Sequence, residues 1–139
     1  MKRLIADHHA IECCSSTLRQ HAEWGDCIDA LVDLTDLHYK IVRHDGLDES
    51  VLFPLLARAL PDLAEPLALV QLQHRLARQL RRETEKYLLA GDAEHAARHV
   101  AELHTLLVGN HTTEEMVIYG CAERLERALV KEHVPICFD

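Results

Sequence analysis

The 139-residue chain has few of the residues that break helices or build strands. It contains 5 glycines and 4 prolines, and aromatic residues make up only 4% of it. Leucine, alanine, glutamate and arginine dominate instead, and such side chains are well tolerated in helices. The chain also shows no strand-like alternation, no linker and no low-complexity tract. The composition therefore predicts a single all-α domain over residues 1–139.

Long apolar runs and an excess of basic charge are also missing. No apolar stretch approaches the roughly 18 residues of a membrane span, and the N-terminus turns acidic too early for a signal peptide. The formal net charge of −8 argues against nucleic-acid binding, which needs a basic face. The five cysteines include no C-x-x-C pair, so we expect reduced, structural thiols rather than a disulfide framework. These absences favour a cytoplasmic protein without a nucleic-acid or membrane partner.

Turn signals divide the chain into four expected helices. The tripeptides WGD at 24–26 and AGD at 90–92 mark two turns, and a pair of prolines brackets a third within 60–66. Between the turns, apolar residues recur at spacings of three and four, as on the buried face of a helix. This pattern predicts an up-down-up-down four-helix bundle over about residues 4–129, with a short C-terminal tail at 130–139. The helices are expected at about 7–24, 26–60, 66–90 and 92–129.

Histidine is abundant, with eleven residues, and its spacing is informative. The second and fourth expected helices each carry a histidine followed at i+4 by a carboxylate, which places both groups on one helical face. The first and third helices supply one further histidine each. Imidazole and carboxylate together suit iron, manganese or zinc, and a carboxylate can bridge two ions. The candidate metal ligands are His8, His44, Asp48, His74, His111 and Glu115.

Two other carboxylates are open alternatives as ligands. Glu49 could replace Asp48, but at i+5 it points about 140° around the helix from His44, so we favour Asp48. Glu12 stands at i+4 from His8 and could be an additional ligand, although we favour a surface carboxylate. A faint internal repeat runs through the same region: DESVLFP at 48–54 resembles EEMVIYG at 114–120.

Four motifs, one in each expected helix, carry a family resemblance: DHHAI, H-x3-DE-x2-LFPLL, QHRLA and H-x3-E. Over about residues 4–125 the chain resembles the hemerythrin-like HHE cation-binding domain family. The resemblance implies a four-helix bundle around a non-haem di-iron centre, with two Fe ions joined by an oxo or hydroxo bridge and with manganese or zinc less expected. It also implies that His8 and His44 bind one iron and that His74 and His111 bind the other. Asp48 and Glu115 would bridge the two.

The chain departs from oxygen-carrying hemerythrins in ways that bear on function. Those proteins have H-x3-H in the third helix, where this chain has Arg78 in place of the second histidine. They have H-x4-D in the fourth helix, where this chain has Glu115 at i+4, and Asp48 stands where the family usually has Glu. A missing histidine leaves one iron open to O2, NO or peroxide, so the resemblance implies a protein that binds or senses such a ligand. The alternative is a di-iron enzyme or iron donor that removes peroxide or nitric oxide or repairs iron–sulfur clusters.

A second polar layer is expected beyond the metal ligands. His38 and His104 precede His44 and His111 by six and seven residues, which corresponds to roughly 9–10 Å along the bundle. This layer could be a proton relay or a ligand entrance, or it could hold ordinary hydrogen-bonded histidines. The first and third helices would add Cys14 or Ser15 and Arg78 or Arg81 to it. On the opposite side of the site the expected layer is apolar, with Leu4, Leu55, Leu67 and Ile118.

Overall fold

The computed structural model of the chain describes residues 1–132, which are helical apart from short turns and contain no strand. The all-α prediction is therefore confirmed for this part of the chain. Two π-helical segments, Asp48–Leu52 and Glu114–Tyr119, continue α2 into α3 and α5 into α6. A 3-10 turn, Pro61–Leu63, precedes α4. The helices are α1 (Lys2–Glu23), α2 (Cys27–Leu47), α3 (Phe53–Ala59), α4 (Ala64–Leu89), α5 (Ala93–Thr113) and α6 (Gly120–Lys131).

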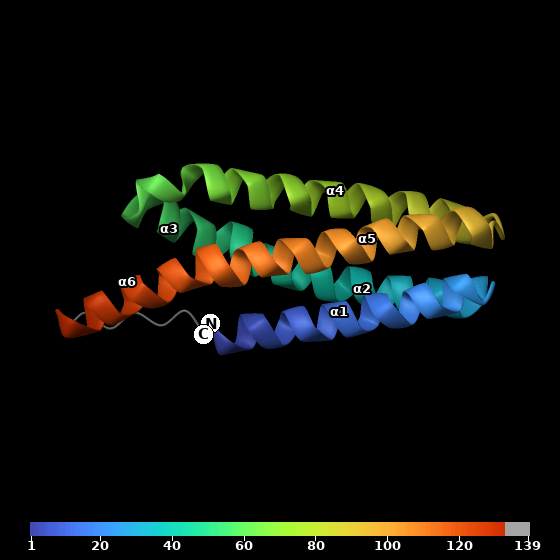
Figure 1. Ribbon diagram of the computed structural model, residues 1–139, viewed down its shortest axis with the longest axis horizontal. Helices are drawn as coiled ribbons and strands as arrows, with labels where there is room; N and C mark the ends of the chain where they lie inside the picture. The colour runs from blue at the N-terminus through green and yellow to red at the C-terminus, as the bar shows by residue number, and fades with distance from the viewer. Residues whose placement is uncertain (133–139) are drawn as a thin grey trace.

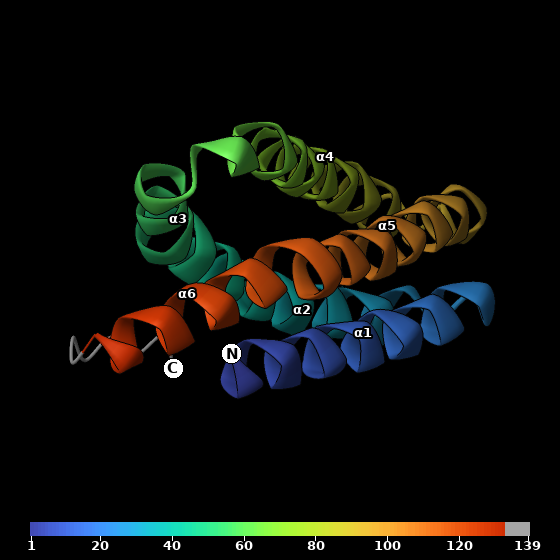
Figure 2. The same ribbon diagram turned by 60° about the vertical axis from the view of Figure 1, so that its left-hand side comes forward.

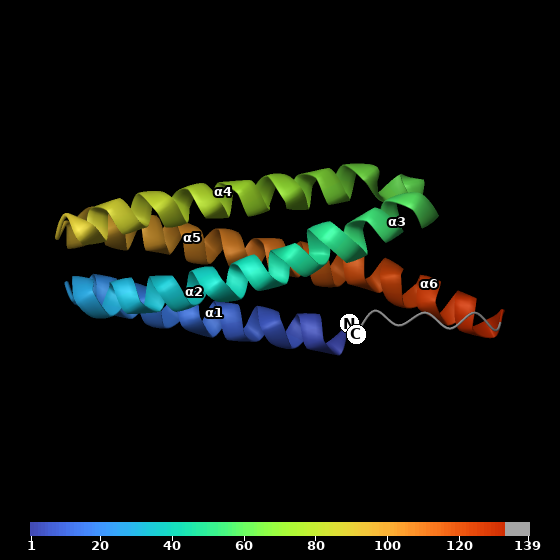
Figure 3. The same ribbon diagram turned by 180° about the vertical axis from the view of Figure 1, so that it is seen from behind.

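Four long helices pack side by side as a helical bundle. The helix α1 contacts α2 and α5, and α4 contacts the same two helices (Figures 1 and 3). The extensions α3 and α6 lie at the same end of the molecule, where they diverge (Figure 2). Each long helix therefore contributes one face to a shared interior, which is where the histidines were expected.

Two matching turns close the other end of the bundle. Gly25 and Gly91 have φ values of 77° and 72°, a conformation that favours glycine. In each turn the residue after the glycine donates its backbone N–H to a carbonyl of the preceding helix, at 2.9 Å, and its side chain caps the next helix. These capping residues are Asp26 and Asp92. Each of the two tripeptides that predicted a turn therefore ends one helix, at its glycine, and begins the next, at its aspartate.

The helices differ from the expectations at one start and at two interruptions. The first helix begins at Lys2 rather than near residue 7, because this earlier start buries Met1 and Leu4 on the core face. The second and fourth expected helices are each interrupted by a π-helical segment, and the segment in the second changes the register of the following turn. As a result Leu55, expected in the core, is 44% exposed, and Leu56 is buried instead.

The core consists of two apolar clusters with a polar layer between them. Three of the residues expected in the apolar layer, Leu4, Leu67 and Ile118, are buried in the cluster next to α3 and α6. The other cluster, which includes Leu18, Leu37 and Leu103, extends toward the glycine turns. No helix within residues 1–132 is long and apolar enough to cross a membrane. The expected tail begins inside α6, and residues 133–139, including Cys137, lie outside the described part of the chain.

The glycine turns predict opposite effects of two alanine substitutions. Gly91→Ala places a Cβ at positive φ and should lower the free energy of unfolding by about 1–2 kcal/mol. Gly109→Ala lies within α5, where a new Cβ meets nothing within 4 Å, and should raise stability by about 0.5–1 kcal/mol. Urea denaturation followed by circular dichroism measures both values. Equal effects of the two variants would contradict the turn geometry.

Candidate metal centre

The polar layer contains one buried imidazole from each of the four long helices. His8 in α1, His44 in α2, His74 in α4 and His111 in α5 are exposed by only 0%, 1%, 2% and 3%. Burying a polar ring is costly unless its nitrogens find partners. The arrangement of nearby carboxylates supplies those partners on both sides of the rings.

Glu114 lies at the centre of the layer and is completely buried. Its Oε2 atom is 2.6 Å from Nε2 of His8 and 3.4 Å from Nε2 of His44. Its Oε1 atom is 2.9 Å from Nε2 of His74 and accepts a hydrogen bond of 2.8 Å from the amide of Asn110. The two oxygens of one carboxylate therefore face different histidines.

Asp48 and Tyr119 complete the interior of the layer. Asp48 is fully buried, and its Oδ2 atom lies 3.2 Å from Nε2 of His44. The buried Tyr119 hydroxyl is 3.2 Å from Asp48 Oδ1, 3.1 Å from Glu114 Oε2 and 3.3 Å from Nε2 of both His8 and His44. A single phenol group thus lies beside most of the inward-facing polar atoms.

The outward-facing Nδ1 atom of each imidazole lies near a different carboxylate. Three of these contacts are hydrogen bonds, and the fourth is longer, leaving Nδ1 of His44 without a hydrogen-bond partner. An Nδ1–H that donates outward leaves Nε2 to face the interior, the arrangement common among metal-binding histidines. The Nδ1-to-oxygen distances are 2.8 Å for His8–Glu115, 2.8 Å for His74–Glu49, 2.9 Å for His111–Glu12 and 3.6 Å for His44–Asp7.

The electrostatics of the layer follow from burial and from these contacts. Burial acts to raise the pKa of Glu114, but hydrogen bonds from His44, His74 and His8 outweigh it and hold that pKa well below the usual range. Burial acts to lower the pKa of His44, yet Asp48 and Glu114 raise it to about 10. The pKa of His74 is raised against burial in the same way to about 9, chiefly by Glu114. In the metal-free protein these two imidazoles therefore carry protons at neutral pH.

Two groups of side chains bring their ligand atoms close enough to hold a metal ion. The first group is His8, His44 and Glu114, and the second group is Asp48, His74 and Glu114; within each group the ligand atoms lie within 4.8 Å of one another. The Nε2 atoms of His8 and His44 are only 2.9 Å apart, so they must share a proton or an ion. Glu114 belongs to both groups, which is the position of a bridging carboxylate. The donor set therefore fits metal binding.

Two of the six candidate ligands lie elsewhere than expected. His8, His44, Asp48 and His74 come together around Glu114. The ring of His111 does not pair with that of His74; it stacks on His8 with ring centres 3.9 Å apart. Burial and the neighbouring His8 lower the pKa of His111 to about 4.

Glu115 does not occupy the interior position that we predicted for it. Its side chain is 34% exposed and accepts from the outer nitrogen of His8, whereas Glu114 faces inward. Glu114 follows the buried Leu107 by seven residues, which returns it to within about 20° of the same helical face. Glu115 is rotated by about 80° from the face of Leu107, so an i+4 rule counted from His111 selects the carboxylate that does not face inward.

The internal repeat contains the signal that identifies Glu114. Aligning DESVLFP with EEMVIYG pairs Asp48 with Glu114 and Glu49 with Glu115. The first pair faces inward and the second pair accepts from outer Nδ1 atoms. Both π-helical segments begin at the inward-facing carboxylate, and such segments are frequent at functional sites. Sequence reasoning also missed Asp45, Asn110 and Tyr119, for which the spacing gives no signal.

The expected second polar layer forms in part. Ser15 is buried, and its hydroxyl lies 2.6 Å from Nδ1 of His104. Burial and the nearby Arg81 lower the pKa of His38. Cys14 instead donates to Asp36. The role of this layer as a relay or an entrance stays a prediction.

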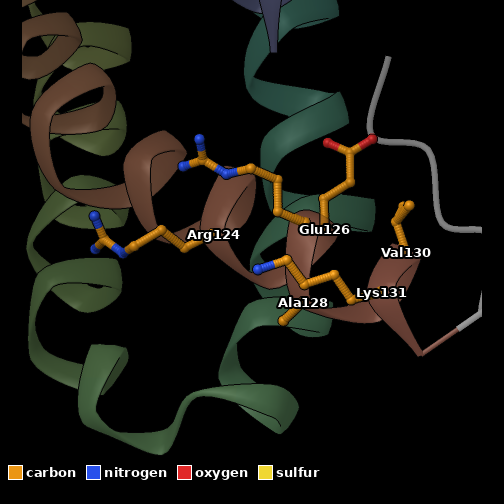
Figure 4. A pocket seen from close by; sticks show the side chains of 6 residues that line it. Arg124, Glu126, Ala128, Val130 and Lys131 are labelled. Atoms are coloured by element: carbon orange, nitrogen blue, oxygen red, sulfur yellow. The ribbon is translucent and has the colours of Figure 1, made fainter.

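Two surface hollows share at most one residue with the polar layer. The hollow drawn in Figure 4 lies along α6, and none of its lining residues belongs to the polar layer. A smaller hollow between α1 and α2 touches the layer at its edge, because Asp7 lines it. The α6 hollow is lined by Arg124, Glu126, Arg127, Ala128, Val130 and Lys131.

Comparisons of the chain with protein-family models, with curated proteins and with solved structures find no match. The resemblance to hemerythrin-like domains therefore stays an expectation from the four motifs. What the structure adds is a buried group of histidines and carboxylates that could hold a metal ion.

The pKa values predict how Glu114 stabilises the metal-free protein. The pKa values of His44 and His74 are raised above the ordinary value of 6.5. Their charged contacts therefore contribute fully to the free energy of unfolding below pH 6.5, and this contribution is lost as the pH rises through about 9 to 10. Glu114→Gln should therefore lower the free energy of unfolding strongly near pH 6.5 and much less near pH 10. Urea denaturation after chelator treatment measures this, with Glu115→Gln as the control. A loss that is equal at both pH values would contradict these contacts.

Proposed function

We propose that this chain is a non-haem di-iron protein of the hemerythrin-like class, an up-down-up-down bundle that binds or senses O2, NO or peroxide. The observation that carries the proposal is the position of Glu114, whose two oxygens face two different groups of ligand atoms. A single carboxylate placed in this way suits a pair of adjacent ions better than a lone one. A cytoplasmic location belongs to the same proposal.

Each residue of the layer has a definite task in this proposal. The first group would hold one ion through two imidazoles, the second group would hold the other through His74 and Asp48, and Glu114 would be a ligand of both. Bound iron supplies Lewis-acid and redox chemistry at this position. The outer carboxylates hold the imidazoles in the tautomer that directs Nε2 inward.

The surroundings favour a small ligand over a large one. Leu52, Phe53 and Ile118 are buried beside the polar layer, and the ring of Phe53 stacks on that of His74 with centres 6.1 Å apart. Apolar side chains in this position would leave room for a small ligand rather than a large one. The Tyr119 hydroxyl lies beside the nitrogens of the first group and can donate a hydrogen bond to a bound ligand.

The same hydroxyl favours the second candidate function, an enzyme or an iron donor. A buried phenol 3.3 Å from two ligand nitrogens could donate a hydrogen bond that stabilises charge developing on peroxide or nitric oxide during their removal. Burial, Glu114 and Asp48 raise the pKa of this phenol, so it keeps its proton. A carrier or sensor would show a reversible ligand spectrum without turnover. An enzyme would show multiple turnovers that slow in Tyr119→Phe, and a donor for iron–sulfur cluster repair would show net loss of iron.

Paired substitutions at neighbouring glutamates test the assignment. Glu114→Gln removes the shared ligand and should reduce the iron retained after desalting from about two per chain to less than about one. Glu115→Gln removes only the outer acceptor of His8 and should weaken iron binding by about 10–100-fold while keeping the stoichiometry. Iron analysis of protein loaded and desalted under anaerobic conditions measures both.

Circular dichroism of the two variants, in the metal-free state, is the control for folding. Full retention of iron by Glu114→Gln, or equal loss in both variants, would contradict Glu114 as the shared ligand. The comparison is sharp because the two substitutions are chemically identical and adjacent in sequence.

A further inference from the structure

We propose that the two ion positions are chemically unequal and that Asp45 is a ligand of the second one. This inference rests on the proposed function, because it assumes that both groups bind an ion. The first group then forms a nitrogen-rich position that is filled first. The second forms an oxygen-rich position that is filled later and accepts a hard divalent cation such as Mn(II).

The two donor sets differ in their atoms. The first group offers two imidazole nitrogens, from His8 and His44, and one oxygen of Glu114. The second group offers a single nitrogen, from His74, together with oxygens of Asp48 and Glu114. An ion in the second position therefore meets mainly carboxylate oxygen even before Asp45 is considered.

Asp45 adds a further oxygen on the side of His74. It is only 7% exposed, and its Oδ1 atom lies 3.5 Å from Nε2 of His74, the nitrogen that faces the interior. Its carboxylate belongs to neither of the two groups and caps none of the outer Nδ1 atoms. A buried carboxylate directed at a ligand nitrogen without a hydrogen bond to it is in reach of an ion held by that nitrogen.

Arg78 orients this carboxylate. Its Nη1 atom is 3.6 Å from Asp45 Oδ2 and 3.7 Å from Glu49 Oε1. A guanidinium stays charged and offers no lone pair to a metal, so Arg78 cannot bind the ion itself. It instead attracts the outer oxygen of Asp45 and leaves Oδ1 on the inner side. Arg78 also contacts the carboxylate that accepts from Nδ1 of His74, so it supports two oxygens around the same imidazole.

The internal repeat contains the same asymmetry. When Asp48 is paired with Glu114, His44 pairs with Asn110 and Asp45 pairs with His111. Asn110 therefore takes the place of an imidazole, and it donates to the oxygen of Glu114 that faces His74. His111 stacks on His8, beside the first group. The first side thus has the imidazoles of His8, His44 and His111, whereas the second has the single imidazole of His74 with Asp45 beside it. Asp48 belongs to the second group but also lies 3.2 Å from Nε2 of His44.

Because the two positions offer different ligand atoms, we expect them to prefer different metal ions. Imidazole nitrogen suits zinc and iron, whereas carboxylate oxygen suits manganese and other hard cations. Zn(II) binds most N/O sites more tightly than Mn(II), but its advantage should be larger at the first position. A limited supply of Zn(II) should therefore fill the first position and leave the second for Mn(II).

Sequential loading of the metal-free protein tests the proposal. One equivalent of Zn(II), then one of Mn(II), should leave about one of each per chain after desalting, with the electron paramagnetic resonance spectrum of isolated Mn(II). Asp45→Asn should weaken Mn(II) binding by about 10–100-fold and change Zn(II) binding by less than about twofold. Asp33→Asn, which alters a carboxylate that contacts His21 and belongs to neither group, is the matched control and should retain both ions.

A second variant tests the converse. Asp45→His adds a nitrogen donor to the second position and should raise the preference of that position for Zn(II) over Mn(II) above that of the wild type. Binding of both ions with the same preference at both positions, or equal loss of both in Asp45→Asn, would overturn the inequality. Failure of the wild-type protein to bind either ion would overturn the proposed function as well, so the two failures are distinguishable.

Discussion

A single buried carboxylate, Glu114, connects the histidines on which the arrangement of the bundle depends. A charge of this kind is costly in a protein interior unless hydrogen bonds and opposite charges surround it. Here the inward nitrogens of His8, His44 and His74 meet it from three other helices. Because these partners come from different helices, satisfying Glu114 fixes the helices relative to one another along their axes. The contacts of Glu114 therefore set both the axial register of the helices and the geometry of the polar layer.

This polar layer divides the core, and the division has consequences for stability. Apolar packing is left to the two clusters on either side, one toward the glycine turns and one beside α3 and α6. The layer between them contributes contacts that depend on protonation, since Asp48 and Glu114 raise the pKa of His44, and Glu114 and Asp45 raise that of His74. An ion bound there would replace those protons and link metal binding to folding. The centre is thus the part of the core whose stability responds to solution conditions.

The sequence predicted the helices and most of the inward histidines because both depend on local periodicity. The turns at Gly25 and Gly91 and the face shared by His44 and Asp48 follow from residue type and spacing alone. The choice between Glu114 and Glu115 does not follow from the i+4 count from His111, because Glu114 continues the face of the buried Leu107 and a π-helical segment begins there. Asp45 and Tyr119 come from positions with no ligand-like spacing, and only the packing of helices brings them to the layer. Internal repetition pairs the two inward carboxylates, Asp48 and Glu114, with each other.

The central claim is that this layer holds a pair of ions. Its most direct test is metal analysis of the full chain, expressed with added iron and purified under anaerobic conditions, against protein concentration from amino-acid analysis. About two metal ions per chain are expected, because the two groups of ligand atoms share one carboxylate. Less than about one metal ion per chain would contradict it, and the histidines would then be a buried hydrogen-bonded network without a metal.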